Sequence, residues 1–301
     1  MRQGLSTRTA APEPQATTVP APVVRAAAPE SVTVIRPTKG RIPIRIPELW
    51  RYRELFAFLV WRDIKVRYAQ TALGAAWMVF QPLAMMLVYT FAFSHLAKVN
   101  IPGIPYPLFA LSGLTLWIFV SRGVMLGSES LVSNIPIVTK TSSPRILIPL
   151  AAVVSVFVDF VIALVLFLVI AAVYGRHPSW RFAFVPPLLL VAFVLAFGIS
   201  LLLSATNVRY RDVGQALPFI VQLWFFLSPV AYLLQTPGHS WETAIQALNP
   251  LVGLILAFRW ALLATPPPHG LLAVAVAVSI GLLVVGLLHF ARLEPTIADD
   301  V

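Results

Sequence analysis

The sequence has 301 residues, of which 58% are hydrophobic and 11% charged, and it carries a formal net charge of +10 and no cysteine. Soluble domains average about 25% charged residues, so the composition is that of an integral membrane protein. The lack of cysteine excludes disulfides, thiolate metal sites and thiol catalysis. The basic residues cluster beside apolar segments, which favours a bias of cytoplasmic loops over nucleic-acid binding.

The N-terminal stretch, residues 1–45, is rich in Ala, Pro, Thr and Arg and lacks the apolar core of a signal peptide. It buries too little apolar surface to offset its ordering entropy, so we expect a disordered cytoplasmic tail.

Residues 46–70 are predicted to form an amphipathic interface helix. Within it, Trp61, Ile64 and Tyr68 share one face. Asp63 can pair with Arg67 four residues later. The simpler interpretation of the basic residues is a positive-inside anchor.

The spans follow from apolar runs of about 20 residues, the length that crosses a hydrocarbon core in a helix. The predicted spans are 71–95, 108–131, 146–174, 183–206, 214–235 and 270–290. The apolar piece within 241–264 is too short to span and is predicted to be re-entrant. We therefore expect an all-α integral membrane domain over 71–294, with 295–301 as a C-terminal tail.

The basic residues of the loops indicate the orientation. Alternate loops divide them ten against four, so both termini and 295–301 are expected to be cytoplasmic. The ten are Arg51, Arg53, Arg62, Lys65, Arg67, Lys140, Arg145, Arg209, Arg211 and Arg292, and the four are Lys98, Arg176, Arg181 and Arg259.

The inventory of chemical groups argues against catalysis in this chain. There is no GxxxxGK[ST] stretch, so the chain does not bind ATP through a P-loop. The five histidines lack metal-ligand spacing, so no metal site is expected. The carboxylates are too dispersed for an acid–base pair, which weakens a membrane-embedded glycan-modifying enzyme as an alternative.

Three ionisable residues fall inside predicted spans: Arg122, Glu129 and Asp159. Charges in a membrane are costly and are often functional. Glu129 lies near the cytoplasmic end of its helix, where it can reach water. Arg122 and Asp159 are deeper and form either a structural ion pair or part of a pathway; if they pair, Asp159→Asn should destabilise the protein.

Aromatic residues are abundant, and several near predicted boundaries fit interfacial belts. A deeper group has two interpretations, helix packing or a stacking surface for sugars. Its members are Trp77, Phe80, Trp117, Phe119, Trp224, Phe225 and Phe226.

Specific blocks of sequence resemble a known family. The quoted blocks are WRDIKVRYAQTALGAAWMVFQPLAMMLVYTFAFSHLAKV, PYPLFALSGLTLW, LVSNIPIVTK, SPRILIPLAAV, VDFVIAL, LSATNVRYRDV, QLWFFLSPVAY, LNP and FRWALL. They resemble ABC transporter type-2 permeases that export polysaccharides such as O-antigen of lipopolysaccharide, capsule and teichoic acid precursors. The likeness covers residues 48–295.

The resemblance implies a half-transporter in the cytoplasmic (inner) membrane. Two copies would form a channel for a lipid-linked glycan, and a separate nucleotide-binding ATPase subunit would hold ATP and Mg. The chain itself would be a transport subunit surrounded by membrane lipid, with no cofactor and no catalytic residue.

The resemblance also implies roles for single residues. Contact with the ATPase would involve Arg62, Asp63, Lys65, Arg67, Asn134, Lys140, Arg145, Arg209, Arg211 and Asp212. The outer gate would involve Trp241, Asn249, Pro250, Arg259 and Trp260, and the deep aromatics would line the channel.

Some positions depart from the family pattern. TKTSSPR lacks the aromatic residue that often precedes Pro-Arg, Arg122 stands where a small or amide residue is usual, and LEPTIADDV follows the family's ending loosely. An ABC type-2 exporter of a lipid or drug is the alternative within the same superfamily.

Overall fold

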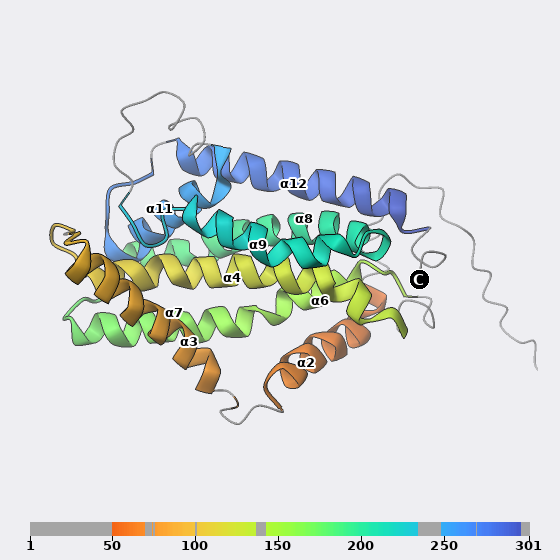
Figure 1. Ribbon diagram of the computed structural model, residues 1–301, viewed down its shortest axis with the longest axis horizontal. Helices are drawn as coiled ribbons and strands as arrows, with labels where there is room; N and C mark the ends of the chain where they lie inside the picture. The colour runs from red at the N-terminus through yellow and green to blue at the C-terminus, as the bar shows by residue number, and fades with distance from the viewer. Residues whose placement is uncertain are drawn as a thin grey trace, which may run out of the picture. The chain divides into compact units, whose positions relative to one another are not determined.

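The computed structural model describes residues 50–69, 74, 76–99, 101–136, 143–233, 248–268 and 270–295. The expected tail 1–45, Lys140, Trp241 and residues 296–301 lie outside the described residues. The described part contains helices joined by loops and no strand. Its elements are α2 (Arg53–Ala69), α3 (Ala76–Tyr89), the π-helix η1 (Thr90–Leu96), α4 (Tyr106–Ser133), α6 (Leu147–Ser155), α7 (Phe157–Val173), the 3₁₀-helix η2 (Trp180–Phe184), α8 (Val185–Arg209), α9 (Asp212–Phe226), α11 (Pro250–Leu263) and α12 (Leu271–Leu293) (Figure 1).

Five helical segments of the described chain are long and apolar enough to cross a membrane. They are Ala76–Leu96, Tyr106–Ser133, Leu147–Val173, Trp180–Arg209 and Leu271–Leu293, which correspond to five of the six expected spans. The all-α membrane fold is thereby confirmed.

For the remaining predicted span, 214–235, the predicted C-terminal end is wrong. Its helix α9 stops at Phe226 and turns follow through Tyr232. With 15 residues α9 is about 22 Å long, shorter than a hydrocarbon core of about 30 Å. Pro229 explains the end of the helix, because a proline disfavours the helical conformation at the residue before it.

The short segment predicted before the last span is a helix. Asn249 caps the N-terminus of α11, since its side chain accepts a hydrogen bond from the Leu251 amide, and Pro250 is the first residue of the helix. Its 14 residues are too few to cross a bilayer. The helix packs against α4, α8, η2 and α12.

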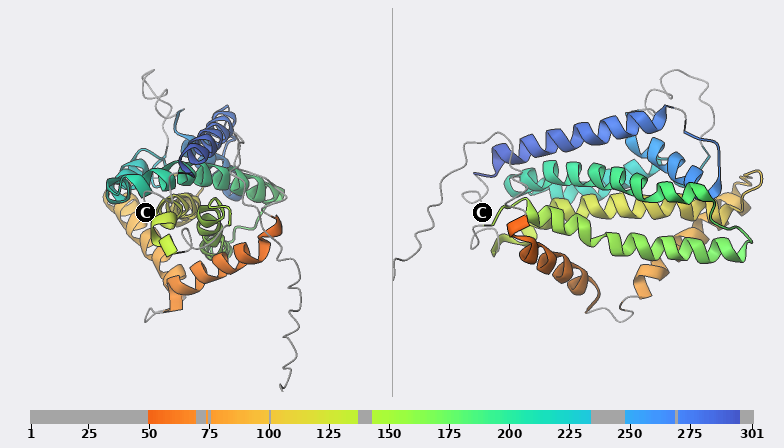
Figure 2. Two further views of the ribbon diagram at one scale, coloured as in Figure 1. Left: turned by 90° about the vertical axis from the view of Figure 1, so that its right-hand side faces the viewer. Right: turned by 180° about the vertical axis from the view of Figure 1, so that it is seen from behind.

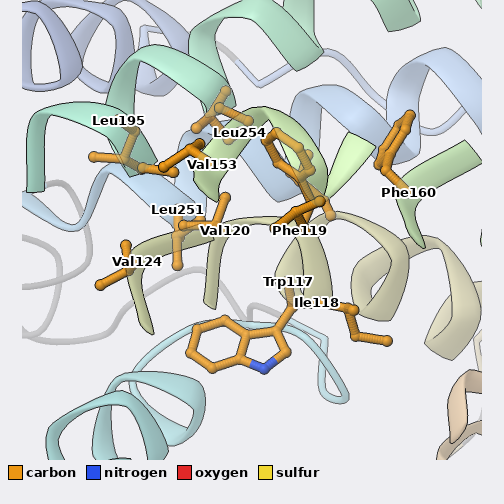
Figure 3. Close-up of a cluster of buried hydrophobic side chains, with 14 of the residues drawn as sticks. Trp117, Ile118, Phe119, Val120, Val124, Val153, Phe160, Leu195, Leu251 and Leu254 are labelled. Carbon is orange, nitrogen blue, oxygen red and sulfur yellow. The ribbon is translucent and has the colours of Figure 1, made fainter. Parts of the chain in front are cut away.

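The core is centred on α4, which contacts α3, α6, α7, α8, α9 and α11. Its apolar side chains mix with those of α6, α7, α8 and α11, as Figure 3 shows for Phe119, Val153 and Leu254. Asn207 of α8 donates to the Ser128 carbonyl of α4 at 3.2 Å, so a polar contact also joins these two helices.

The helix ends divide into two groups (Figures 1 and 2). The C-terminal ends of α4, α8 and α12 lie on the same side of the bundle as α2 and the N-terminal ends of α6 and α9. This side is called the α2 end below. Nearly all described members of the larger group of ten basic residues lie on elements at this end. The opposite end carries η1, η2 and the loop 264–268.

Candidate functional site

A buried carboxylate, Asp159, lies where α2 meets the membrane bundle. Only 3% of its side chain is exposed. Arg67 donates from Nη1 to its Oδ2 at 2.8 Å, and the Tyr68 hydroxyl donates to its Oδ1. Arg122 Nη1 lies 3.0 Å from the same Oδ2. The pairing of Arg122 with Asp159 that the sequence suggested is therefore present, with Arg67 as a second cation.

Local structure places these groups together. Asp159 lies in the first turn of α7, just after the break in the helix at Val156. Arg67 and Tyr68 stand in the last turn of α2. Arg67 Nη2 also donates to Ser155 Oγ of α6 at 2.7 Å, and Arg122 of α4 donates to Gln81 of α3. The group, called the Asp159 cluster below, joins α2, α3, α4, α6 and α7.

The electrostatics of the Asp159 cluster are asymmetric, because two guanidinium groups share one carboxylate. Leaving a buried charge without its partner costs about 3–5 kcal/mol. Because Asp159 has two cations, it keeps one partner when the other is lost. Burial raises the pKa of the Tyr68 phenol, and Asp159 acts in the same direction. Tyr68 is thus protonated at neutral pH and donates its hydrogen bond.

The expected pair between Asp63 and Arg67 is wrong. Asp63 instead binds its neighbour Arg62, whose Nη2 and Nε lie 2.7 and 3.1 Å from Oδ1. An exposed pair four residues apart on a helix contributes only about 0.2–0.5 kcal/mol. Pairing of Arg67 with Asp159 is favoured over pairing with Asp63, because Asp159 is buried and an unpaired buried carboxylate is costly. Tyr68 also differs from the predicted apolar face, since its hydroxyl binds inside the bundle while Trp61 is 64% exposed.

A cavity of about 490 Å³ lies beside the cluster, between α2, the C-terminal part of α4 and the C-terminal end of α6. Arg62, Asp63 and Arg67 line it from α2, and Glu129 and Asn134 line it from the end of α4. Glu129 therefore faces a cavity whose lining includes charged and polar side chains.

The other predicted ATPase contacts lie at the α2 end without forming one cluster. Arg209, Arg211 and Asp212 are exposed between α8 and α9, and the Arg209 guanidinium covers the Tyr210 ring. Asn134 donates to the Ser130 carbonyl at the end of α4. Two further contacts complete the set: Lys65 is exposed on α2, and Arg145 donates to the Glu294 carbonyl after α12. Burial raises the pKa of the Glu294 carboxyl, which Arg145 opposes.

The deep aromatics divide into three kinds. Phe119 is fully buried between Phe157 and Phe160, which favours helix packing over a stacking surface for sugars. Trp117, 6% exposed, packs edge-on against Trp224 and Phe225 and belongs to the interior. The third kind is exposed on α3 and α9 and comprises Trp77, Phe80 and Phe226.

The predicted gate residues surround α11 rather than a single opening. Asn249 Oδ1 accepts from Trp224 Nε1 at 3.0 Å, and its Nδ2 donates to Ser228 Oγ at 3.0 Å, so it joins α11 to the end of α9. Trp260 packs against Trp180 and Phe184, with the Arg181 guanidinium over its ring.

Arg259 is 2% exposed and donates from Nη2 to the Val230 carbonyl at 2.6 Å. Its guanidinium carbon lies 3.5 Å from the centre of the Phe109 ring. This residue holds the turn after α9 against α4 and α11.

Three members of the Asp159 cluster were absent from the predicted site: Tyr68, Gln81 and Ser155. Gln81 and Ser155 carry a signal in the sequence, because each is a polar side chain inside an apolar run. Their partners are 41 and 88 residues away, so only the packing of the helices brings them together.

Residues 54–263, from α2 through α11, match the family described as ABC-2 type transporter. An O-antigen export system permease protein, RfbA of Myxococcus xanthus, is 34% identical over 215 residues, covering 71% of this chain and 82% of the relative. A protein of the same description from Klebsiella pneumoniae is 29% identical over 82% of this chain and 94% of its own length. The polysialic acid transport protein KpsM of Escherichia coli is 24% identical over 67% of this chain and 78% of its own length.

Proposed function

We propose that this chain, which belongs to the ABC-2 type transporter family, is the permease subunit of an ATP-driven exporter of a lipid-linked polysaccharide. The observation that carries the proposal is the similarity to O-antigen export permeases over most of both chains. The likeness to a polysialic acid transport protein supports a polysaccharide as the cargo class. The relatives are named as transport subunits, not as enzymes.

The partner in this proposal is a separate ATPase that supplies ATP, Mg and the energy of hydrolysis. It would bind the α2 end, where α2, the N-terminal end of α6 and the exposed turn Arg209–Asp212 lie. The excess of basic residues at that end supports a cytoplasmic location for it and for both termini, in the cytoplasmic (inner) membrane.

The second partner is another copy of the chain. Trp77 and Phe80 on α3 and Phe226 on α9 are between 43% and 66% exposed, and these helices bury few of their own side chains. In the proposal these faces form the dimer contact and the wall of the glycan path. Aromatic rings suit that wall, because sugars slide over them without fixed hydrogen bonds.

Deletion of the gene in its own cell tests the cargo. We expect surface polysaccharide to disappear and lipid-linked glycan to accumulate inside, with both reversed by a plasmid copy. Surface polysaccharide of normal amount but altered structure would instead support a glycan-modifying enzyme. Unchanged polysaccharide with altered membrane lipid or drug resistance would support the lipid or drug exporter.

A charge reversal tests the ATPase contact. The variant Arg209→Glu/Arg211→Glu should insert normally yet retain less ATPase in purified membranes and export less glycan. Lys98→Glu is the matched control, since Lys98 is exposed at the opposite end. Equal ATPase retention by both variants would remove the turn from the contact.

A further inference from the structure

We infer that Asp159 is an exchangeable anchor for α2: during transport Arg67 leaves it for Glu129, while Arg122 keeps the carboxylate paired. The inference rests on the proposed function, since an ATPase acting on α2 would supply the motion. It assigns to Arg67, Arg122, Asp159 and Glu129 a role in transmitting that motion to the membrane helices.

The first support is the double pairing of Asp159. Arg67 and Arg122 approach the same oxygen, at 2.8 and 3.0 Å, from different helices. If α2 moves away, Arg67 and Tyr68 go with it, but Arg122 belongs to α4 and stays. The carboxylate is then still paired inside the bundle, so the step avoids the main cost of breaking a buried ion pair.

The second support is the destination of Arg67. Arg67 and Glu129 both line the cavity beside α2, together with Ser130 and Asn134. Among the residues that the structure describes, Glu129 forms no ion pair within 4.0 Å, whereas Asp63 in the same cavity is paired with Arg62. A guanidinium that leaves Asp159 therefore finds a carboxylate and polar groups in the space next to it.

The third support is the weak hold on α2 itself. Leu59 is the one fully buried side chain in the described part of this helix, and α2 packs mainly on α6. Its polar link to α7 is the contact of Arg67 and Tyr68 with Asp159. Because this contact is at the last turn of α2, its release frees that turn, while Leu59 and the side chains around it keep the earlier turns of α2 on the core.

Stability measurements on the two arginine variants distinguish a carboxylate shared by two cations from a carboxylate in a single ion pair. Arg67→Gln and Arg122→Gln should each leave Asp159 with one cation and lower the unfolding temperature little. Arg67→Gln/Arg122→Gln should lower it by more than the sum of the two, because the carboxylate is then unpaired. Additive shifts in purified protein would overturn the shared anchor.

Glu129 gives a test of the released state. Glu129→Gln should reduce glycan export several-fold while ATP hydrolysis by the complex and the unfolding temperature stay near the wild-type values. Glu129→Asp, which keeps the charge, should restore part of the export. Export unchanged in Glu129→Gln, or equally low in Glu129→Asp, would remove Glu129 from the exchange.

A reversible cross-link tests the motion directly, and the cysteine-free chain makes an engineered pair unique. Val66 on α2 and Ala152 on α6 line the same cavity, so Val66→Cys/Ala152→Cys places two thiols on it that a bifunctional thiol reagent with a reducible spacer can bridge. Closing this cross-link should stop export while the complex still hydrolyses ATP, and a reductant should restore export. Export by the cross-linked protein at the same rate as after reductant treatment would overturn the inference.

The same measurements separate this inference from the proposed function. If the wild-type complex exports no polysaccharide, the proposed function fails. If the wild type exports and the closed cross-link does not change the rate, the function holds and the exchange at Asp159 is wrong.

Discussion

Arg259 and Asp159 represent two ways of keeping a charge inside the described bundle. Asp159 has two cations for partners, whereas Arg259 has no carboxylate within 4.0 Å among the described residues and rests on a carbonyl and an aromatic face. Space for it comes from Gly113, where an added Cβ would lie 2.8 Å from Arg259 Nη2. The guanidinium is therefore held by packing and by polar contact together.

Truncation of Arg259 separates these contributions. Arg259→Ala should lower the free energy of unfolding by about 2–5 kcal/mol, as expected for a large side chain removed from a core. Arg259→Met keeps much of the volume and removes a buried charge, so its loss should be clearly smaller. Thermal unfolding followed by tryptophan fluorescence measures both. An equal loss in the two variants would mean that the contact with the Val230 carbonyl, not volume, dominates.

At the residue scale the sequence indicated which groups needed a partner and suggested the pair of Arg122 with Asp159, but it did not indicate the second partner of Asp159. Arg122 and Asp159 were singled out because a charge in a span is costly. The involvement of Arg67, 92 residues from Asp159, could not be derived, since Asp63 was the only carboxylate within one helical turn. Burial, which the sequence does not display, decided between the two.

Among the helices, α8 and α12 show how closely two backbones approach. Gly198 and Gly286 lie at the crossing, and a Cβ added to Gly286 would be 2.3 Å from the Gly198 carbonyl oxygen. A Cβ added to Gly198 would be 2.6 Å from the Leu283 nitrogen. Small residues at such crossings give membrane helices their van der Waals contact in the absence of a hydrophobic driving force.

Alanine substitution at two glycines of α12 tests this crossing. Gly286→Ala should destabilise the protein by more than 1 kcal/mol, roughly the cost range of overpacking. Gly281→Ala, on the same helix with nothing within 4 Å, should be neutral or stabilising because alanine favours helix. The two unfolding temperatures in one detergent give the comparison. Similar values would mean that the helices separate at no cost.

Proline is an ambiguous sign of a helix end in this sequence. Pro229 accounts for the early end of α9, whereas Pro82 and Pro218 lie inside α3 and α9. The break between α6 and α7 at Val156 lies in VVSVFVDF, which contains neither proline nor glycine. Ser155 and Asp159 lie on either side of this break, and both accept hydrogen bonds from Arg67 of α2.

For the molecule as a whole, the distribution of basic residues predicts orientation. Arg292 is exposed at the α2 end after the last span, and His177 is exposed at the opposite end between α7 and η2. In spheroplasts, a membrane-impermeant maleimide should label His177→Cys from outside and Arg292→Cys only after permeabilisation. The cysteine-free background makes both signals specific. Labelling in the reverse order would place the α2 end, and with it the ATPase, on the wrong side for transport.

The glycine crossing of α8 and α12 also has a mechanical consequence. The two backbones are in direct contact at the glycines, which leaves little room for α12 to move along α8. Because α8 also packs extensively on α4, we expect these three helices to move as one rigid unit. By contrast α2, α3 and α9 each bury at most three side chains among their described residues. A force applied to α2 would therefore displace the peripheral helices α2, α3 and α9 relative to the rigid unit. Amide hydrogen exchange should accordingly be slow in α4 and α8 and fast in α2 and α9.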